Sequence, residues 1–368
     1  MKVLQVLPAL QGGGVERGTL EIANALVSSG HESWVLSAGG QMVSELEDEG
    51  SVHVSWDISK KSPLTLFQVK KLRAWLQSGE FDILHVRSRM PAWLIWLAWR
   101  GMDPKTRPRL VSTVHGMHSV SRYSEIMTYG EQVVAVSESI QNYIFENYPR
   151  VNKAKVRLIY RGVNPAEFSR GYEADAAWQE RWYQQYPQLK NQIVITLPGR
   201  LTRLKGHLAF LNALASLRKN GLPVFAVIVG GEDPKRLAYA REVYAKANEW
   251  GLDGKVVFAG HRSDMKEIYS VSNLVVSLSS KPESFGRTVL EALSLGVPVL
   301  GYAHGGVKEV LSSLFPDGLV EPNDERALVD RMKKLLTNDE NIVKINDRYL
   351  LSEMKSQTLM LYAEMLKK

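Results

Sequence analysis

The sequence contains no cysteine in its 368 residues. This absence excludes disulfides, thiolate metal sites and cysteine nucleophiles. Long apolar runs are also missing, because the longest, from Met90 to Trp99, falls short of the about 20 residues that cross a bilayer. No spacing of the His-x-x-x-His or Asp-x-Asp kind occurs, so we expect no protein-bound metal. Met1 and Lys2 lead directly into an apolar strand, and we therefore expect a soluble, cytoplasmic protein without a signal peptide.

Strong charge asymmetry is absent too. The net charge is +7 and the pI is about 9.3, but Lys and Arg number 19 against 16 acids in residues 1–168 and 27 against 23 in residues 169–368. A cationic excess spread over both halves favours anionic small ligands or an anionic membrane surface, and we expect no nucleic-acid partner. The length exceeds the size at which one hydrophobic core keeps growing, which indicates two domains.

Short apolar strands alternate with amphipathic helices in both halves. The first series runs from the strand at 3–7 to the strand at 156–159, and the second from 193–197 to 297–300. Alternation of this kind predicts α/β domains with doubly wound parallel sheets. Residues 164–191 interrupt the pattern with polar and aromatic residues, which indicates a linker with a peripheral helix, and from about residue 324 the chain is predicted to be helical.

The stretch from Lys281 to Leu300 places two carboxylates, Glu283 and Glu291, eight positions apart. Glu283 follows a buried strand and Glu291 falls on the next helix, so Glu283 is expected at the carboxyl edge of a sheet, where α/β proteins bind ligands. Taken alone, the pair fits an acid/base couple, a metal site or a clamp on a hydroxyl-rich ligand.

Three further stretches follow predicted strands. Arg200 and Lys205 lie where a strand gives way to a helix, so their charges and the helix N-terminus can converge on a phosphate. Gly12, Gly13 and Gly14 can bring backbone N–H groups close to a phosphate or sugar, although a ligand-free turn is the alternative. His115 ends another strand, where it could act as a base, as a hydroxyl donor or as a structural residue.

Tryptophans at 93, 96 and 99 recur every three residues beside several arginines. Indole rings beside cations suit a membrane interface, but this spacing is more typical of a helix that faces a core. A second cluster of cations fits either a partner surface or a solvated edge: Arg150, Lys153, Lys155, Arg157 and Arg161.

A set of motifs resembles one known family, the retaining glycosyltransferases of family four, which have the GT-B fold. The matching residues extend over nearly the whole chain: Gly13-Gly14-x-Glu16-Arg17, Val114-His115-Gly116, Val136-Ser137-Glu138, Gly162-Val163-Asn164, Gly199-Arg200 with Lys205-Gly206, Glu283-x-Phe285-Gly286 with Glu291-Ala292, and Gly305-Gly306 with Glu309. The segment from His85 to Trp93 is similar to a branch that builds the bacterial lipopolysaccharide core. Asn164 and Tyr160-Arg161 depart from the family pattern, at positions expected to lie away from the chemistry.

The resemblance implies two Rossmann-like domains that face a cleft. Residues 1–165 would form the N-terminal, acceptor-side domain, 166–191 a linker and peripheral helix, and 192–345 the C-terminal nucleotide-sugar domain. Residues 346–368 would form a helix that packs back on the first domain.

The resemblance also implies roles for single residues. Arg200 and Lys205 would hold the donor diphosphate, Glu283 the transferred sugar and Glu291 the ribose. The remaining donor contacts would come from the glycine loop of the first domain and from two turns of the second: Gly13, Gly14, Gly260, His261, Ser284, Phe285 and Gly286. His115 would line the gap between donor and acceptor, and it joins Arg200, Lys205 and Glu283 as a catalytic residue.

The function implied is a metal-independent, retaining hexosyl- or heptosyltransferase without a cofactor. Its donor would be a UDP-, GDP- or ADP-linked sugar, and its acceptor a lipid-linked oligosaccharide of the lipopolysaccharide core or another cell-envelope glycan. We expect a cytoplasmic enzyme, peripheral on the inner face of the bacterial inner membrane. The alternatives are a GT-B nucleotide-sugar epimerase and a scaffold that binds sugar or lipid without catalysis.

Overall fold

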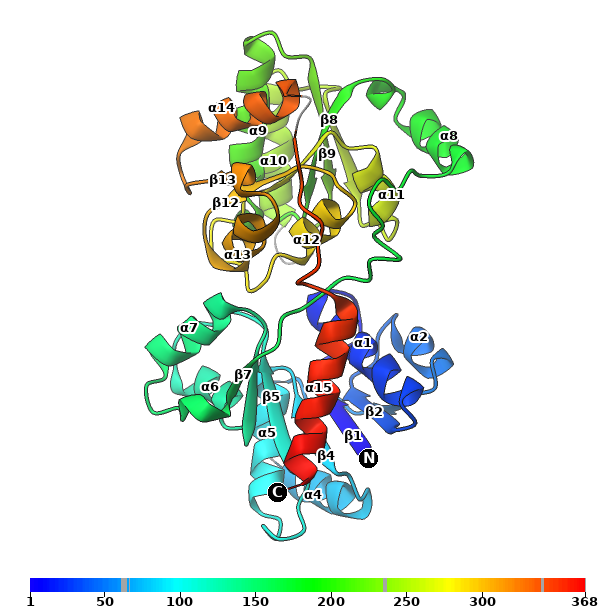
Figure 1. Cartoon of the computed structure of the whole chain (residues 1–368), viewed down its shortest axis with the longest axis vertical. Coiled ribbons are helices and arrows are strands. Elements are labelled where there is room, and N and C mark those ends of the chain that lie inside the picture. The colour runs from blue at the N-terminus through cyan, green and yellow to red at the C-terminus, as the bar shows by residue number, and fades with distance from the viewer. Residues whose placement is uncertain (61–64, 66, 234–236, 339–340, 368) are drawn as a thin grey trace. The chain divides into compact units, whose positions relative to one another are not determined.

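The computed structural model describes residues 1–60, 65, 67–233, 237–338 and 341–367. The chain forms two compact units (Figure 1). Unit 1 comprises Met1–Arg161 and the C-terminal segment that begins at Leu351, and unit 2 comprises Gly162–Leu350. Each is built on one parallel sheet with helices on its faces, which confirms the predicted fold class. Among the described residues, no helix is both long and apolar enough to span a membrane.

The sheet of unit 1 has seven strands in the order β3-β2-β1-β4-β5-β6-β7, all paired in parallel. The strands are β1 (Lys2–Val6), β2 (Glu32–Ser37), β3 (Val52–Ser55), β4 (Ile83–Val86), β5 (Arg109–Val114), β6 (Gln132–Ala135) and β7 (Val156–Leu158). The order runs outward in both directions from the β1–β4 pair, so this pair is the switch point at which a doubly wound sheet opens a crevice.

The helices of unit 1 connect these strands and include the last helix of the chain. They are α1 (Gly14–Ser28), α2 (Val43–Asp48), α4 (Gln68–Ser78), α5 (Arg89–Arg100), α6 (Arg122–Glu125), η1 (Ile126–Thr128), α7 (Glu138–Asn147), η2 (Lys153–Lys155) and α15 (Leu351–Leu366). Ser137 caps the N-terminus of α7, since its side chain accepts a hydrogen bond from the amide of Ile140 at 3.1 Å.

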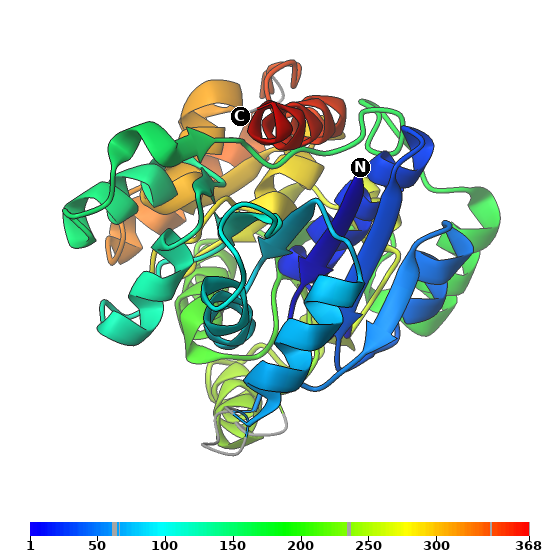
Figure 2. The same ribbon diagram turned by 90° about the horizontal axis from the view of Figure 1, so that it is seen from below.

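Alternate residues of each central strand of unit 1 pack on opposite faces. Val3 and Ile83 share an apolar cluster with α1 and with Leu361 of α15, whereas Leu4 and Leu84 join the helices α4 and α5 on the other face. Figure 2 shows α15 across the sheet from those two helices. The period of two along each strand therefore decides which helix layer a residue contacts.

The sheet of unit 2 has six parallel strands in the order β10-β9-β8-β11-β12-β13. The strands are β8 (Ile193–Pro198), β9 (Val224–Val229), β10 (Val256–Gly260), β11 (Leu274–Ser277), β12 (Val299–Tyr302) and β13 (Leu319–Val320). The switch point here lies between β8 and β11.

The helices of unit 2 cover both faces of this sheet. They are α8 (Ala176–Gln185), η3 (Pro187–Leu189), η4 (Arg203–Lys205), α9 (His207–Lys219), α10 (Leu237–Glu249), α11 (Met265–Ser270), α12 (Arg287–Ser294), α13 (Gly305–Leu314), η5 (Pro316–Gly318) and α14 (Glu325–Thr337).

The segment 166–191, expected to be a linker with a peripheral helix, is part of unit 2. Trp178 and Trp182 of α8 are buried and stack at 5.1 Å between ring centroids, and they pack with Val194 and Val257 of the sheet. The aromatic residues of this stretch therefore bind it to the core. The chain returns to unit 1 at Leu351, where α15 packs beside α1 (Figure 1); Lys368 lies outside the described residues.

The tryptophan stripe lies on α5 and packs inward. Trp99 is buried and donates to the carbonyl of Pro108 at 2.7 Å, while Trp93 donates to the carbonyl of Tyr123 at 3.0 Å. Trp96 is partly buried against Tyr129. The stripe therefore follows the core interpretation of the sequence rather than the membrane one.

Candidate active site

Unit 2 gathers the predicted donor residues at the carboxyl ends of adjacent strands. Arg200 follows β8 and Glu283 follows β11, and these two strands form the switch point of the sheet. Parallel strands all end at one edge, so the loops after β8, β11 and β12 lie next to one another there. The sheet order therefore places side chains that are 83 positions apart in the sequence at one site.

The turn after β8 is fixed by a glycine that no other residue can replace without strain. Gly206 has φ of 74°, and a Cβ on it would lie 2.0 Å from the carbonyl oxygen of Leu278. The missing side chain lets this turn lie directly against the end of β11. Arg200 is exposed at the start of the turn, and Lys205 is partly exposed at its end.

Lys205 reaches across to Glu283. Its Nζ lies 2.6 Å from Oε1 of Glu283, and the hydroxyl of Ser279 donates to the same oxygen. Burial alone would raise the pKa of Glu283, but the charge of Lys205 and the hydrogen bonds from Lys205 and Ser279 outweigh it, so the pKa lies below its ordinary value. Glu283 is therefore a carboxylate at neutral pH and accepts hydrogen bonds.

Two groups outside the predicted set of donor contacts support Glu283. His304 places Nε2 2.8 Å from the carbonyl of Ser279, so this nitrogen donates, and the amide of Gly306 donates to the carbonyl of Glu283 at 2.8 Å. A Cβ on Gly305 would lie 2.5 Å from that same carbonyl oxygen. His304 comes two residues after the end of β12, so the rule that strand ends share an edge could have found it.

Glu291 lies on α12, the helix that begins after Gly286 in the left-handed conformation. The guanidinium of Arg287 donates to its Oε1 at 2.9 Å and the hydroxyl of Tyr269 to its Oε2 at 3.5 Å. Only 9% of Glu291 is exposed. The structure thus holds this carboxylate on a helix close to the sheet, with a cation beside it.

The other predicted donor contacts lie on two turns. Gly260 ends β10 with φ of 67°, its carbonyl accepts from the amide of Gly230 at 2.8 Å, and the next residue, His261, is exposed. Ser284 is partly buried, whereas Phe285 is buried and packs edge-on against Tyr349 at 5.7 Å between centroids. Phe285 can therefore offer a ligand only its backbone.

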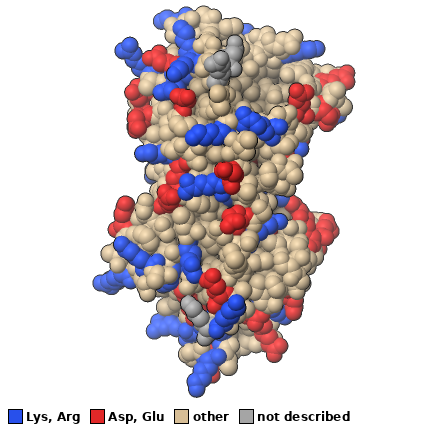
Figure 3. All heavy atoms as spheres, viewed as in Figure 1, with Lys and Arg blue, Asp and Glu red and all other residues tan. Residues whose placement is uncertain are grey.

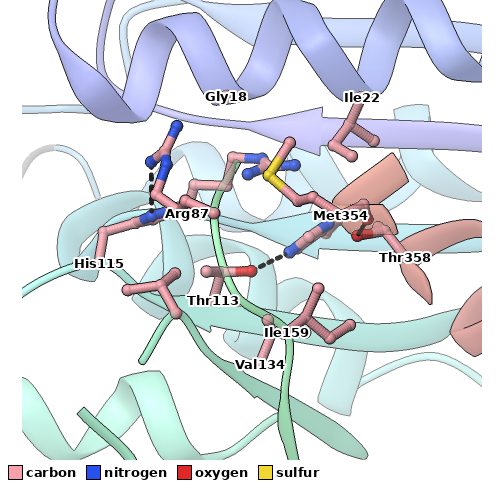
Figure 4. Close-up of a pocket in the computed structure, with 12 residues that line it drawn as sticks. Gly18, Ile22, Arg87, Thr113, His115, Val134, Ile159, Met354 and Thr358 are labelled. Carbon is pink, nitrogen blue, oxygen red and sulfur yellow. Dashed lines mark hydrogen bonds between the residues drawn. The ribbon is translucent and has the colours of Figure 1, made fainter. Parts of the chain in front are cut away.

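Unit 1 holds the remaining three predicted residues. Gly13 caps α1 with φ of 143° and Gly14 opens that helix, while His115 follows β5. His115 Nδ1 lies 3.5 Å from Nη1 of Arg161 (Figure 4). The prediction that the departure at Arg161 lies away from the site is wrong, because Arg161 contacts His115, and it is buried rather than part of a solvated edge.

Burial lowers the pKa of the His115 imidazole well below its ordinary value, and the nearby charges of Arg161 and Arg87 add to this effect. His115 is therefore neutral at physiological pH. The neutral imidazole offers no positive charge to a phosphate, but it can donate one hydrogen bond and accept another.

The described residues include no group of three or more His, Asp or Glu close enough to hold a metal ion. The cationic side chains on the described part of the unit 2 edge include Arg200, Lys205 and Arg287.

Two family models match the chain, one in each half. Residues 12–167 match the model described as Glycosyltransferase Family 4, and residues 179–348 match the model of glycosyl transferases group 1.

Known proteins share this arrangement over their full length. The structure superposes on a glycosyltransferase from Rickettsia africae with a TM-score of 0.87 and 29% identity, covering 100% of this chain and 99% of that one. It superposes on Anabaena HepE in complex with UDP-glucose with a TM-score of 0.82 and 21% identity, covering 100% and 99%. N-acetyl-alpha-D-glucosaminyl L-malate synthase of Bacillus anthracis is 24% identical over 354 residues, 90% of this chain and 86% of that protein. With a family match in each half and this fold throughout, the chain is a glycosyltransferase of the GT-B fold, with family 4 and group 1 domains.

Proposed function

We propose that this protein is a retaining glycosyltransferase that moves a sugar from a nucleotide-diphosphate sugar to a lipopolysaccharide-core or other cell-envelope oligosaccharide. The observation that carries the proposal is the ion pair between Lys205 and Glu283 at the switch point of unit 2, with the exposed Arg200 at the start of the turn that carries Lys205. This edge combines cations for a diphosphate with a carboxylate for sugar hydroxyls.

In this proposal Arg200 and Lys205 bind the donor diphosphate. Their charges offset the negative charge that grows on the leaving group as the bond from the anomeric carbon to the phosphate oxygen breaks. Lys205 can contact the donor while it stays within reach of Glu283, because its side chain is about a third exposed. The two side chains supply this stabilisation without a protein-bound metal, so a chelator should leave the rate unchanged.

Glu283 accepts hydrogen bonds from the transferred sugar, and Glu291 accepts them from the ribose. The low pKa of Glu283 and its ion pair with Lys205 suit a hydrogen-bond acceptor better than a nucleophile or a general acid. We therefore propose attack on the same face of the sugar. The leaving diphosphate takes the bonding electrons and receives the proton of the acceptor hydroxyl, so the anomeric configuration is kept.

The donor proposal is supported by the Anabaena structure of similar fold, which holds UDP-glucose. We propose a UDP-sugar as the first donor to test, with GDP- and ADP-sugars beside it. In unit 1, Gly13 and Gly14 are proposed to contribute backbone amides to the phosphates and His115 to line the acceptor side.

A lipid-linked acceptor and a peripheral membrane location complete the proposal. They are supported by the similarity of the segment from His85 to Trp93 to enzymes of the lipopolysaccharide core and by the net charge of +7. On the face drawn in Figure 3, Lys and Arg alternate with Asp and Glu over both units, so attachment there would be weak and sensitive to salt. Fractionation at low and high salt tests this, and a protein that stays in the supernatant at low salt would contradict it.

The central test combines binding with turnover. Nucleoside diphosphates should raise the thermal unfolding midpoint, and Arg200→Ala or Lys205→Ala should abolish that rise. Incubation with UDP-, GDP- and ADP-sugars and an envelope glycolipid extract, followed by mass spectrometry, should show transfer with retained anomeric configuration. Conversion of the donor without any acceptor to an isomeric sugar would indicate an epimerase instead, and an unchanged midpoint shift in both variants would refute the diphosphate assignment.

A further inference from the structure

A buried histidine lies at the base of the turn that carries Arg200 and Lys205. His207 is the first residue of α9, directly after Gly206, and it is 0% exposed. The side chain of Arg200, by contrast, is exposed and makes no hydrogen bond or ion pair with the residues that the structure describes. The place that its guanidinium reaches therefore depends on the backbone of the turn.

The imidazole of His207 faces that backbone. Burial lowers its pKa to about 4, hydrogen bonds with the backbone of Gly199 and Thr202 oppose this effect, and the charge of Lys205 adds to it. Only an acceptor raises the pKa of an imidazole, so the backbone groups that face the ring are carbonyls. Nε2 makes no hydrogen bond of ordinary length and angle with the described residues, so the contacts with the carbonyls are long or bent. The ring thus faces the turn on both sides of Arg200.

Tyr239 of α10 orients this ring. Its hydroxyl lies 3.4 Å from Nδ1 of His207, and the two rings meet edge to face with centroids 5.9 Å apart. Burial raises the pKa of the Tyr239 hydroxyl to about 12, although hydrogen bonds from the backbone of His207 and Leu208 lower it. A hydroxyl that accepts from amides keeps its own hydrogen for Nδ1, so we assign the ring proton to Nε2. This N–H is then the group that can donate to the carbonyls of the turn.

We propose that His207 is a positioning residue of the donor site. Its imidazole, oriented by Tyr239, joins the start and the end of the turn 199–206. In this way it fixes where Arg200 and Lys205 meet one diphosphate. The inference rests on the proposed glycosyl transfer and adds to it a residue that lies behind the turn and does not touch the donor. Cations held in place before binding need no reorganisation when the ligand enters or when charge grows on the leaving group.

A histidine with a purely structural role would behave differently. At the start of α9 it would stabilise only the helix and the core of unit 2, so its loss would weaken every part of a bound nucleotide alike. A positioning histidine acts on the phosphate contacts, because Arg200 and Lys205 are the groups that it places. Comparison of a nucleoside diphosphate with its nucleoside therefore separates the two roles.

The test measures the dissociation constants of UDP and uridine on the full-length protein, by calorimetry and by displacement. His207→Phe removes both ring nitrogens and keeps a buried ring. It should raise the dissociation constant of UDP about tenfold and change that of uridine less than about twofold. With a donor sugar, kcat should fall while the donor KM rises. Tyr172→Phe is the control, since it removes a hydroxyl that donates to Glu267 elsewhere in unit 2, and both constants should stay unchanged.

Two milder variants decide the matter if His207→Phe does not fold. His207→Gln keeps an N–H that can donate to the carbonyls of the turn, so it should restore most of the affinity for UDP. Tyr239→Phe removes only the hydroxyl that orients the imidazole. It should raise the dissociation constant of UDP about threefold, again with little effect on uridine.

The outcomes that contradict the proposal are distinct from those that contradict the proposed function. An unchanged dissociation constant of UDP in a folded His207→Phe or Tyr239→Phe protein would overturn the positioning role. Equal losses for UDP and uridine would overturn it too, because His207 would then support the fold alone. If UDP, GDP and ADP all fail to bind the wild type, the proposed donor site itself is refuted.

Discussion

The two sheets have the same architecture, but the charged side chains at their carboxyl edges differ in burial and in the partners that hold them. In unit 2, Lys205 and Glu283 form a direct ion pair with side chains 32% and 21% exposed, and Arg200 is exposed beside them. In unit 1, Arg87 and Arg161 are buried, and Arg87 is held by the amide of Gln5.

The difference indicates that the two edges respond differently when a charged ligand approaches. A partly exposed ion pair can open and share its cation with an incoming diphosphate at small cost, because water compensates both partners while the ligand exchanges. A buried arginine oriented by a neutral amide cannot relax in this way, because little water reaches its partners. The charged side chains of the unit 2 edge can therefore rearrange around a ligand more easily than the buried arginines of unit 1.

The largest expected effect comes from removing the exposed cations of unit 2. Arg200→Ala or Lys205→Ala should lower kcat about 100- to 1000-fold, because each deletes a charge that stabilises the leaving diphosphate. Arg203→Ala is the matched control, since Arg203 lies on the same turn but pairs with Glu242 and is 70% exposed. Initial rates with the donor found in the screen measure the effect, and equal losses in all three variants would show that the turn, rather than the two charges, is responsible.

A second change disturbs the unit 2 edge without altering its charge. Gly206→Ala introduces a Cβ 2.0 Å from the backbone of Leu278 at a φ of 74°, and we expect a loss of about 3 kcal/mol in the free energy of unfolding. Gly221→Ala is the control, because Gly221 has a similar φ of 83° and open space around it, so it should cost only about 1–2 kcal/mol. Urea unfolding measures both, and equal losses would mean that the close contact with β11 contributes nothing.

A fall in pH should lower the free energy of unfolding of unit 1 more than that of unit 2. Burial lowers the pKa of His207 in unit 2 to about 4, whereas it lowers the pKa of five histidines in unit 1, of which His118 also lies at about 4: His31, His53, His85, His115 and His118. These pKa values lie below that of the unfolded chain, so the unfolded state binds more protons and stability falls as the pH drops below about 6.5. His207 alone should cost about 1.4 kcal/mol at pH 5.5.

Hydrogen exchange with mass spectrometry, corrected for the intrinsic rate at each pH, reports the two units separately. The protection of backbone amides against exchange should decline between pH 7 and 5.5 in both units, and the decline should be larger in unit 1. His207→Gln should reduce the decline in unit 2 and leave that of unit 1 as it is. A decline of the same size in both units of the wild type would contradict this expectation.

The smallest effect is expected at the surface of unit 1. Arg157 and Glu364 form an ion pair at 2.7 Å that joins β7 to α15, and both side chains are about half exposed. Arg157→Ala should change the free energy of unfolding by less than about 1 kcal/mol, because water screens the pair. A larger loss in urea unfolding would show that the end of α15 depends on this contact.

Much of the fold follows from the sequence. Buried parallel strands appear in the sequence as short apolar runs, so the strand predicted at 193–197 agrees with β8 (Ile193–Pro198) to within one residue. The two-residue strand β13 was missed, since Leu319 and Val320 are too few to form a pattern. The aromatic stretch 166–191 was taken for a linker because Trp178 and Trp182 lie among polar residues, and the alternation of the strands does not show that they pack on unit 2.

The common position of Arg200 and Glu283 at one sheet edge was predictable, because each comes after a predicted strand. The Lys205–Glu283 pair itself was not predicted, since it depends on how closely Gly206 lets one turn approach the next strand. The burial of Arg87 and Arg161 in unit 1 was missed for a related reason. Both resemble surface cations in sequence, and they are accommodated by residues on other elements, among them Gln5 and Gly18.

The return of α15 to unit 1 has a consequence for the order in which the chain can fold. Val3, Ile83 and Val111 of the sheet pack with Leu361 and Met365, so one face of unit 1 has no complete covering until the last helix has been synthesised. Unit 2 is continuous from Gly162 to Leu350 and leaves the ribosome before that helix. We therefore expect the second unit to reach its native state first during translation, while the first waits with an apolar surface that chaperones recognise.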